Sequence, residues 1–336
     1  MSEGVSRRVL LGSAAALASP KIASAESSTV LKLAHTDPVG GARQKAAEHF
    51  AAGLAAITGG RYQVQIHPAG QLGNDITQLD QLRLGSIDFA VTAPAAYATH
   101  LRALHLFSLP YLVETYEQGW KLYDEGNWFR SKFARLPERG FRVVSNWEAG
   151  FRSFTTKSEL RSPADAVGKK IRVFPSDIIH WIMESLGFTA VVLPVTDVYL
   201  AIQQGAVVGQ ENPIDTIFAQ KFYEVAPFIS LTRHVYSPTP LAISERTWKR
   251  LPEADQALIV QAANDASAFS RKLTVEEEKR QLLEMQALGA TIIQPDLAPF
   301  RMAMQVVNDR ARNAYGATDV DALLADAETI RTATKG

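Results

Sequence analysis

Apolar and polar residues alternate along several short segments near the N-terminus, and longer amphipathic stretches separate them. A period of two predicts a half-buried strand, and an Ala-rich amphipathic stretch that ends at a Gly pair predicts a helix. Read in this way, the first part of the chain predicts a strand, a helix, a strand, a helix and a strand, at residues 29–35, 42–57, 62–67, about 74–84 and 87–91. This alternation predicts an α/β sheet.

The alternation restarts after about residue 140. Strands are predicted at residues 142–146, 151–155, 170–174 and 189–193, and helices at 177–186 and 197–204. Gly187 and Gly205 follow these two helices, at the positions where Gly commonly ends a helix. We therefore expect two α/β halves, each with its own sheet.

A long helix is predicted at residues 253–288. Pro252 precedes it, Glu253 and Asp255 occupy its first turn, and no Gly or Pro follows until Gly289. At a rise of about 1.5 Å per residue the helix would extend about 54 Å, more than a small domain of about 30 Å. We expect it to pack on both halves of the molecule. The alternative is a pair of helices broken near Thr274.

The amino-acid composition excludes several classes of function. The chain has 336 residues, which suggests two domains, and 35 basic against 35 acidic residues. That balance leaves no basic excess to neutralise nucleic-acid phosphates. The chain has no Cys, which excludes disulfides, a thiol nucleophile, iron–sulfur clusters and Cys-ligated zinc.

Residues 1–25 have the features of a signal peptide. Arg7-Arg8 precedes a short apolar stretch at residues 9–18, and Ala23-Ser24-Ala25 is a small-residue cleavage motif. The paired arginines fit a twin-arginine signal, and a general secretory route is the alternative. A membrane anchor is disfavoured because the apolar stretch is too short to span about 30 Å of hydrocarbon. Cleavage would leave a mature chain with a net charge of −2.

Common catalytic and metal-binding motifs are missing. The sequence has no G-x-S-x-G, G-x-x-x-x-G-K-[ST], G-x-G-x-x-G or H-E-x-x-H motif, and its seven His are scattered. We expect neither a cofactor nor a metal. An exported hydrolase whose serine triad is assembled from distant residues is the alternative from another function class.

Four separated segments carry the remaining signal: Gln71–Asp75 (QLGND), Gly150–Thr156 (GFRSFTT), Gly168–Val173 (GKKIRV) and Gly209–Pro213 (GQENP). In this combination the chain resembles the solute-binding proteins of tripartite ATP-independent periplasmic (TRAP) transporters, the DctP family. The resemblance runs from about Val30 to Thr329.

The resemblance implies a two-lobed α/β clamp like other periplasmic binding proteins, with a sheet flanked by helices in each lobe and the long helix spanning both. We assign residues 26–149 plus about 238–270 to lobe I, and residues 150–237 plus about 271–330 to lobe II. The expected function is capture of a small organic acid in the periplasm and its delivery to a membrane permease, by a monomer without enzymatic activity. A binder that presents its ligand to a sensor is left open.

The resemblance also assigns roles to residues. Arg172 would form a bidentate pair with the ligand carboxylate, with Arg152 as a second cation and Asn212 as an amide donor. Asp75 would contribute a polar contact from the other lobe. The alternatives are a surface ion pair for Arg172, a turn-forming role for Asn212 and a helix cap for Asp75. Further candidates are the aromatic Trp147 and Phe174, and the hydroxyl-binding His35, Thr36 and Asp215.

Positions at which this chain differs from its relatives narrow the range of expected ligands. Sialic-acid binders carry Glu where this chain has Ala93 and Asn where it has Thr36, and the family often has Asp where it has Val208. Sialic acid is therefore not expected. The polar candidates favour a small hydroxylated acid, such as a uronate or an aldonate. A C4-dicarboxylate, with Arg152 binding its second carboxylate, is the nearest alternative.

Overall fold

The structure, a computed structural model, describes Met1 and residues 28–334. The predicted signal peptide, apart from Met1, lies outside the described residues. The strands are β1 (Thr29–His35), β2 (Tyr62–His67), β3 (Phe89–Val91), β4 (Phe141–Thr156), β5 (Lys170–Val173), β6 (Thr189–Val192), β7 (Gly209–Pro213), β8 (Phe228–Ser244) and β9 (Thr291–Ile293). The α-helices are α1 (Ala42–Ile57), α2 (Asp75–Leu84), α3 (Tyr116–Glu125), α4 (Asn127–Phe133), α5 (Asp177–Leu186), α6 (Val198–Gln203), α7 (Ile214–Ala219), α8 (Phe222–Val225), α9 (Glu245–Arg250), α10 (Glu253–Ala287), α11 (Leu297–Tyr315) and α12 (Ala317–Ala333).

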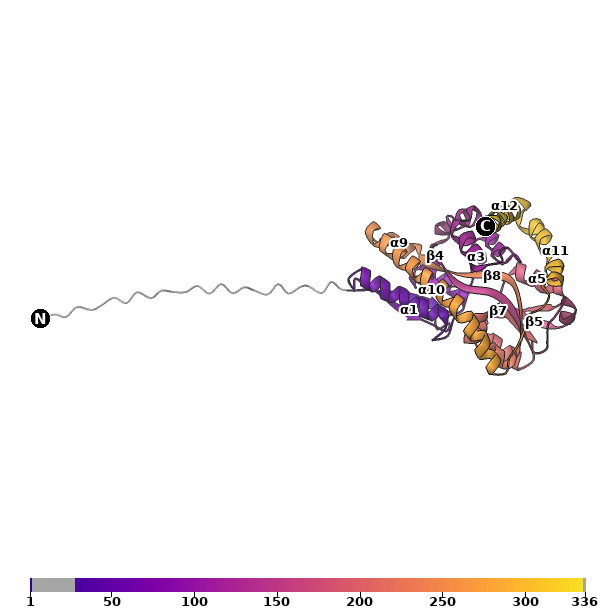
Figure 1. Cartoon of the computed structure of the whole chain (residues 1–336). Coiled ribbons are helices and arrows are strands. Elements are labelled where there is room, and N and C mark those ends of the chain that lie inside the picture. The colour runs from indigo at the N-terminus through magenta and orange to yellow at the C-terminus, as the bar shows by residue number, and fades with distance from the viewer. Residues whose placement is uncertain (2–27, 335–336) are drawn as a thin grey trace.

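The strands form one hydrogen-bonded sheet in the order β2-β1-β3-β8-β4-β7-β5-β6, with β9 paired to β8. We call β2, β1 and β3 the β1 side, and β7, β5 and β6 the β5 side. The long antiparallel strands β4 and β8 join the two sides, and Figure 1 shows them curving through the centre of the molecule. The α/β prediction is confirmed, but the two halves share these central strands, so their sheets are continuous.

The sequence pattern predicted two strands where β4 is one. Its pairing with β8 shifts register between Val143 and Ser145 and between Glu148 and Gly150, and Gly150 has a φ of 105°. These bulges interrupt the strict alternation from which strands are predicted. The pattern did not predict β8 at all, because Pro238 and Pro240 lie inside it and Pro argues against a central strand.

The helix α10 is a single helix of 35 residues, so the alternative of two helices broken near Thr274 is wrong. It packs on α1 and β4, and further along on α7 and β9. Near its start, Asp255 accepts a hydrogen bond from Tyr62 at 2.7 Å. Near its end, Gln281 donates to Asp215 at 2.8 Å. The helix therefore ties the β1 side to the β5 side, as predicted.

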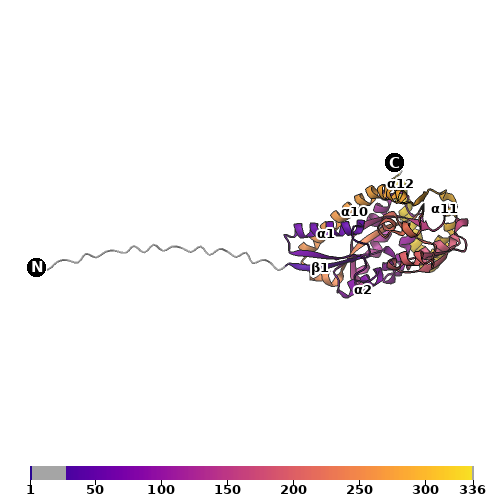
Figure 2. The ribbon, with the colours of Figure 1, turned by 90° about the horizontal axis from the view of Figure 1, so that it is seen from below.

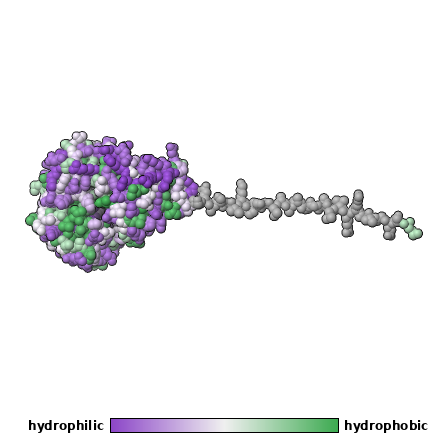
Figure 3. Space-filling view, turned by 180° about the vertical axis from the view of Figure 1, so that it is seen from behind, coloured by the Kyte–Doolittle hydropathy of each residue, from purple (hydrophilic) through white to green (hydrophobic). Residues whose placement is uncertain are grey.

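Helices cover both faces of the sheet. Figure 2 shows α1 and α10 on one face of β1 and α2 on the other. The C-terminal helices pack on other helices, α11 on α5 and α12 on α3 and α4. Seen from behind, the surface of the molecule is largely hydrophilic, and its hydrophobic residues gather in separate patches (Figure 3). No helix within residues 28–334 is both long and apolar enough to cross a bilayer.

Candidate ligand-binding site

A small cavity lies between the β1 side and the β5 side. Its volume is about 40 Å³, room for a few water molecules at roughly 10–15 Å³ each. The lining combines charged groups, hydroxyls, an amide and one aromatic ring, and it comes from both sides of the sheet. The lining residues are Thr36, Asp37, Arg43, Asp75, Ala93, Pro94, Ala149, Arg152, Arg172, Phe174, Val195, Asn212, Pro213, Thr216, Ser237 and Thr239.

Arg172 is buried in this lining with its charge uncompensated by a direct ion pair. It lies on β5, is 2% exposed, and donates from Nε and Nη2 to the Leu193 carbonyl at 2.9 and 2.7 Å. Within residues 28–334 no carboxylate forms a salt bridge with it. Burial lowers the pKa of Arg172 to about 10, although the more distant charge of Glu211 acts in the opposite direction. The site therefore holds a guanidinium suited to an incoming anion.

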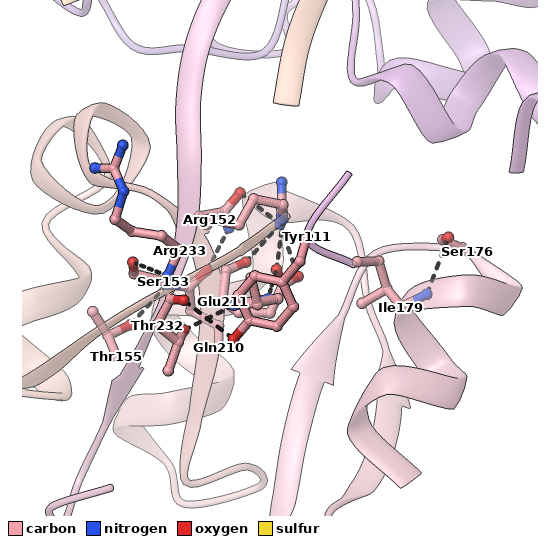
Figure 4. A network of polar contacts seen from close by, with 12 residues as sticks. Tyr111, Arg152, Ser153, Thr155, Ser176, Ile179, Gln210, Glu211, Thr232 and Arg233 are labelled. Atoms are coloured by element: carbon pink, nitrogen blue, oxygen red, sulfur yellow. Dashed lines mark hydrogen bonds and ion pairs between the residues drawn. The ribbon is translucent and has the colours of Figure 1, made fainter. Parts of the chain in front are cut away.

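Arg152, by contrast, is paired within the protein. It lies on β4 opposite β7, where Glu211 Oε2 and Oε1 accept from its Nε at 2.5 Å and its Nη2 at 2.8 Å (Figure 4). Both residues are buried, and His234 Nε2 lies 3.2 Å from Glu211 Oε2. Burial raises the pKa of Glu211, but the charge of Arg152 and the hydrogen bond from His234 outweigh it and lower the pKa to about 2. Arg152 is thus a fixed cation at the edge of the cavity.

Asn212 and Phe174 lie beside this ion pair. Asn212 Oδ1 accepts from Arg152 Nη2 at 3.0 Å, and its Nδ2 donates to Gln210. The Nδ2 group carries a second hydrogen, which leaves it able to donate to a ligand. The Phe174 ring centre lies 4.6 Å from the Arg152 guanidinium carbon. The β5 side therefore contributes the Arg172 cation and the Asn212 amide donor to the cavity, and the shared strand β4 contributes Arg152.

The β1 side contributes carboxylates and a hydroxyl. Asp75 Oδ1 accepts from the Ala93 backbone N–H at 2.9 Å and from Thr36 Oγ1 at 3.5 Å. The helix cap of α2 is Asn74, whose side chain accepts from the Thr77 backbone N–H. Asp75 is therefore not the cap, and it faces the cavity instead.

Three of the predicted residues do not line the cavity. The His35 ring is bonded to Gln44 at 2.8 Å, and burial lowers its pKa to about 4. Trp147 is 1% exposed in the core and packs edge-on against Phe50. Asp215 lines a separate hollow beside α10, where it accepts from Gln281. The strand and helix positions of the three residues placed them near the site, but the side chains of His35 and Trp147 point into the packed interior.

The structure also adds residues that the sequence pattern missed. Arg43, in the first turn of α1, is 8% exposed, lies 3.4 Å from Asp37 and donates to Thr36 at 3.2 Å. Its Nε makes no hydrogen bond within the described chain. The hydroxyls of Thr216, Ser237 and Thr239 complete the lining. Arg43 follows β1 by one loop, so its position after a strand was the available signal.

Comparison with known proteins identifies the family of this chain. Residues 33–313 match the DctP family, described as bacterial extracellular solute-binding protein, family 7. The sialic acid-binding periplasmic protein SiaP of Vibrio cholerae is 29% identical over 285 residues, which cover 84% of this chain and 88% of SiaP.

Solved structures agree with this match. The sugar acid binding protein DctPAm of Advenella mimigardefordensis, in complex with galactonate, has a TM-score of 0.87 and 26% identity, covering 90% of this chain and 99% of its own. A TRAP periplasmic solute binding protein of Polaromonas, bound to D-erythronate, has a TM-score of 0.85 and 28% identity, covering 88% and 98%. The chain therefore belongs to the DctP family of TRAP transporter solute-binding proteins, as its motifs and its two-lobed α/β fold indicated.

Proposed function

We propose that this protein binds a small hydroxylated monocarboxylate, of the uronate or aldonate class, in the cavity between the β1 and β5 sides. It would act in the periplasm as a monomer and deliver the acid to a TRAP permease. The observation that carries the proposal is Arg172, a buried guanidinium without a carboxylate partner in the described chain. Burying an unpaired charge is costly, and a ligand carboxylate would supply the missing partner.

The opposite wall of the cavity favours hydroxyl groups over a second carboxylate. Asp37 and Asp75 line it, and ionised carboxylates accept hydrogen bonds from hydroxyls. Arg43 lies on the same wall and pairs with Asp37 at 3.4 Å, but Asp75 has no ion pair within residues 28–334. A C4-dicarboxylate would bring its second carboxylate towards this like charge, which costs binding energy. Ala93 provides no further polar group at this wall. We therefore favour a polyhydroxy monocarboxylate over succinate.

Ligand entry requires the cavity to open. About 40 Å³ is far below the roughly 300–1,000 Å³ of ordinary ligand pockets. We propose a hinge motion between lobe I (26–149 plus about 238–270) and lobe II (150–237 plus about 271–330). An acid that contacts both walls would stabilise the closed form by its differential contacts.

The experiment is a thermal-shift screen of the mature chain with galactonate, galacturonate, erythronate and succinate, followed by calorimetry. A ligand at about 100 times its Kd should add about 2.7 kcal/mol of stability. We expect the sugar acids to bind more tightly than succinate. Equal or tighter succinate binding would reverse the assignment of ligand class, and no shift with any acid would contradict the proposal. Mass spectrometry of the recovered acid distinguishes a binder from a hydrolase, because a binder returns the acid unchanged.

A further inference from the structure

A second hollow lies outside the cavity described above. It is a groove of about 1400 Å³ with helices α3 and α4 on one wall, α9 and α10 on the other, and residues 142–146 of β4 as its floor. Figure 1 shows α3, α9 and α10 around β4. None of the residues that line the groove also lines the cavity that contains Arg172.

The floor of the groove is a free edge of the sheet. From Phe141 to Arg152, β4 pairs with β8 on one side, whereas β7 reaches β4 on the other side only from Arg152 onwards. Side chains of α10 cover this edge at Asn146, whose carbonyl accepts from Ser267 at 2.5 Å and from Arg271 at 3.1 Å. Between Arg142 and Ser145 the described chain supplies no second strand.

Three buried polar atoms of the groove have no hydrogen-bond partner within the described residues: Ser145 Oγ, Asn146 Oδ1 and Arg271 Nε. Ser145 is 8% exposed and Asn146 is 6% exposed. Leaving a buried donor or acceptor unpaired is unfavourable. All three atoms are shielded from solvent, so they form an unsatisfied polar layer beneath the groove and are not direct contacts for a ligand that lies in it.

The charges of the lining favour an anion. Four cationic side chains face two carboxylates, and Arg271 pairs with Asp124 at 2.7 Å while Lys272 lies 3.9 Å from Glu276. Arg130 forms no ion pair within residues 28–334. Arg142 donates from Nε and Nη2 to the two carboxylate oxygens of Glu245, at 3.3 Å each, and its side chain is 36% exposed. With Glu245 counted, the groove keeps an excess of one positive charge, which Arg130 supplies.

The rest of the lining is apolar and flat. Trp120 and Trp248 are half-buried, and the Arg142 guanidinium carbon lies 4.8 Å from the Trp248 ring centre. Phe133 and Val260 are also half-buried, and Val275 is 41% exposed. Indole faces beside guanidinium groups suit a flat apolar body that carries a negative charge.

We propose that this groove is a second ligand site, for an amphipathic organic anion. The apolar body would lie against Trp120 and Trp248, and the carboxylate or sulfonate head would accept hydrogen bonds from Arg130 and Arg142. The site is independent of the sugar-acid cavity, since the two share no residue.

The test uses 8-anilinonaphthalene-1-sulfonate (ANS) as probe, titrated by fluorescence into the mature folded chain. We expect saturable binding at one site and about tenfold weaker binding to Arg142→Ala, the loss of about one charge-assisted contact. Arg310→Ala is the matched control, because Arg310 also lies over an indole, at 4.9 Å from Trp181, pairs with Glu184 and is 41% exposed. Arg310→Ala and Arg172→Met should both leave the ANS affinity unchanged.

The neutral analogue N-phenyl-1-naphthylamine tests the charge. We expect it to bind at least about tenfold more weakly than ANS. Equal affinity for the neutral analogue, or an equal loss in Arg142→Ala and Arg310→Ala, would overturn the proposal. The absence of saturable ANS binding would also overturn it. Circular dichroism of each variant confirms that it remains folded, because unfolded chains also bind ANS.

Discussion

Arg172 and Arg152 are neighbours of like charge whose surroundings differ. Arg152 is neutralised by Glu211 at 2.5 Å, whereas Arg172 donates to a carbonyl oxygen and has no ion pair in the described chain. Removing one side chain of a buried ion pair leaves the charge of its partner uncompensated. Removing an unpaired charge leaves no other charge uncompensated. The two arginines should therefore respond differently to the same substitution.

We predict that Arg172→Met lowers sugar-acid affinity by about 2–5 kcal/mol, because the buried ligand carboxylate loses its partner. The thermal midpoint without ligand should change little, since the loss of the bonds to Leu193 is offset by removal of a buried charge. Arg152→Met should instead lower the free energy of unfolding by about 3–5 kcal/mol, because the buried Glu211 loses its ion pair and keeps the His234 contact. Calorimetry and denaturant titration measure the two effects. Unchanged affinity in Arg172→Met would remove Arg172 from the site.

The buried Asp215 makes stability depend on pH. Burial, followed by the charge of Asp37, raises its pKa from 3.8 to about 6. The unfolded chain therefore loses this proton at lower pH than the folded chain, so the free energy of unfolding falls as pH rises from about 4 to about 6.

The free energy of unfolding of Asp215→Asn should equal that of the natural chain at pH 4 and exceed it at pH 8 by up to about 3 kcal/mol. This figure follows from about 1.36 kcal/mol per pKa unit. Urea titrations at the two pH values measure this, with the exposed Asp265→Asn as control. A variant that is less stable at pH 8 would show that the carboxylate is stabilising there. Sugar-acid affinity should be unchanged, because Asp215 does not line the cavity.

Part of the lining could be predicted from the sequence. Arg172, Asn212 and Asp75 lie in short motifs, and the structure brings them to one cavity together with Arg152, Thr36 and Phe174. Arg43 was missed because it belongs to a helix whose composition predicts packing alone. Trp147 was misplaced because strand position does not determine which face of the sheet a side chain occupies once a bulge shifts the register.

At the level of elements, segments with regular alternation were predicted well, as β1, α1 and β2 show. The strand β8 was not, because its pairing with β4 depends on residues far away in the sequence, such as Glu148 opposite Pro238, 90 positions apart. Tertiary context of this kind overrides local pattern. The continuity of the sheet was missed for the same reason.

The strand β7 begins with a glycine that has no space for a side chain. A Cβ at Gly209 would collide with the Thr155 backbone oxygen and lie 2.9 Å from Thr156 Cα, both on the paired strand β4. Gly53, inside α1, has no atom within 4 Å of such a Cβ.

Gly209→Ala should therefore lower the free energy of unfolding by about 1–3 kcal/mol or more through overpacking. Gly53→Ala should raise it by about 1 kcal/mol, because Ala favours the helix. Denaturant titration of both variants measures the changes. Equal effects of the two substitutions would contradict the close approach of β7 to β4.

On the scale of the whole molecule, one hydrophobic cluster reaches both sides of the sheet, beside a cluster between β1 and α1 and another around α6, α7 and α8. A single hydrophobic cluster contains Leu82 of α2, Phe141 of β4, Ile171 of β5 and Phe300 of α11. The elements β4, β8 and α10 also run through both sides. Neither side can lose its packing without exposing the other.

We expect differential scanning calorimetry of the mature chain to give one unfolding transition, with equal calorimetric and van't Hoff enthalpies. A bound sugar acid should move that transition as a whole. Two resolved transitions, or a ligand that shifts one of two, would show that the sides unfold independently. The Gly209→Ala variant provides a check, since weakening the β5 side should lower the single midpoint without splitting it.

The shared strands also constrain how such a protein can change its ligand over evolutionary time. A lobe whose segments are interleaved along the chain, with β4, β8 and α10 common to both, cannot be replaced by recombination at one crossover. Exchange of a whole lobe by recombination would need several crossovers at once, each inside a buried helix or strand. We therefore expect new specificities to arise by substitution of individual cavity residues, such as Thr36 or Ala93, on an unbroken scaffold.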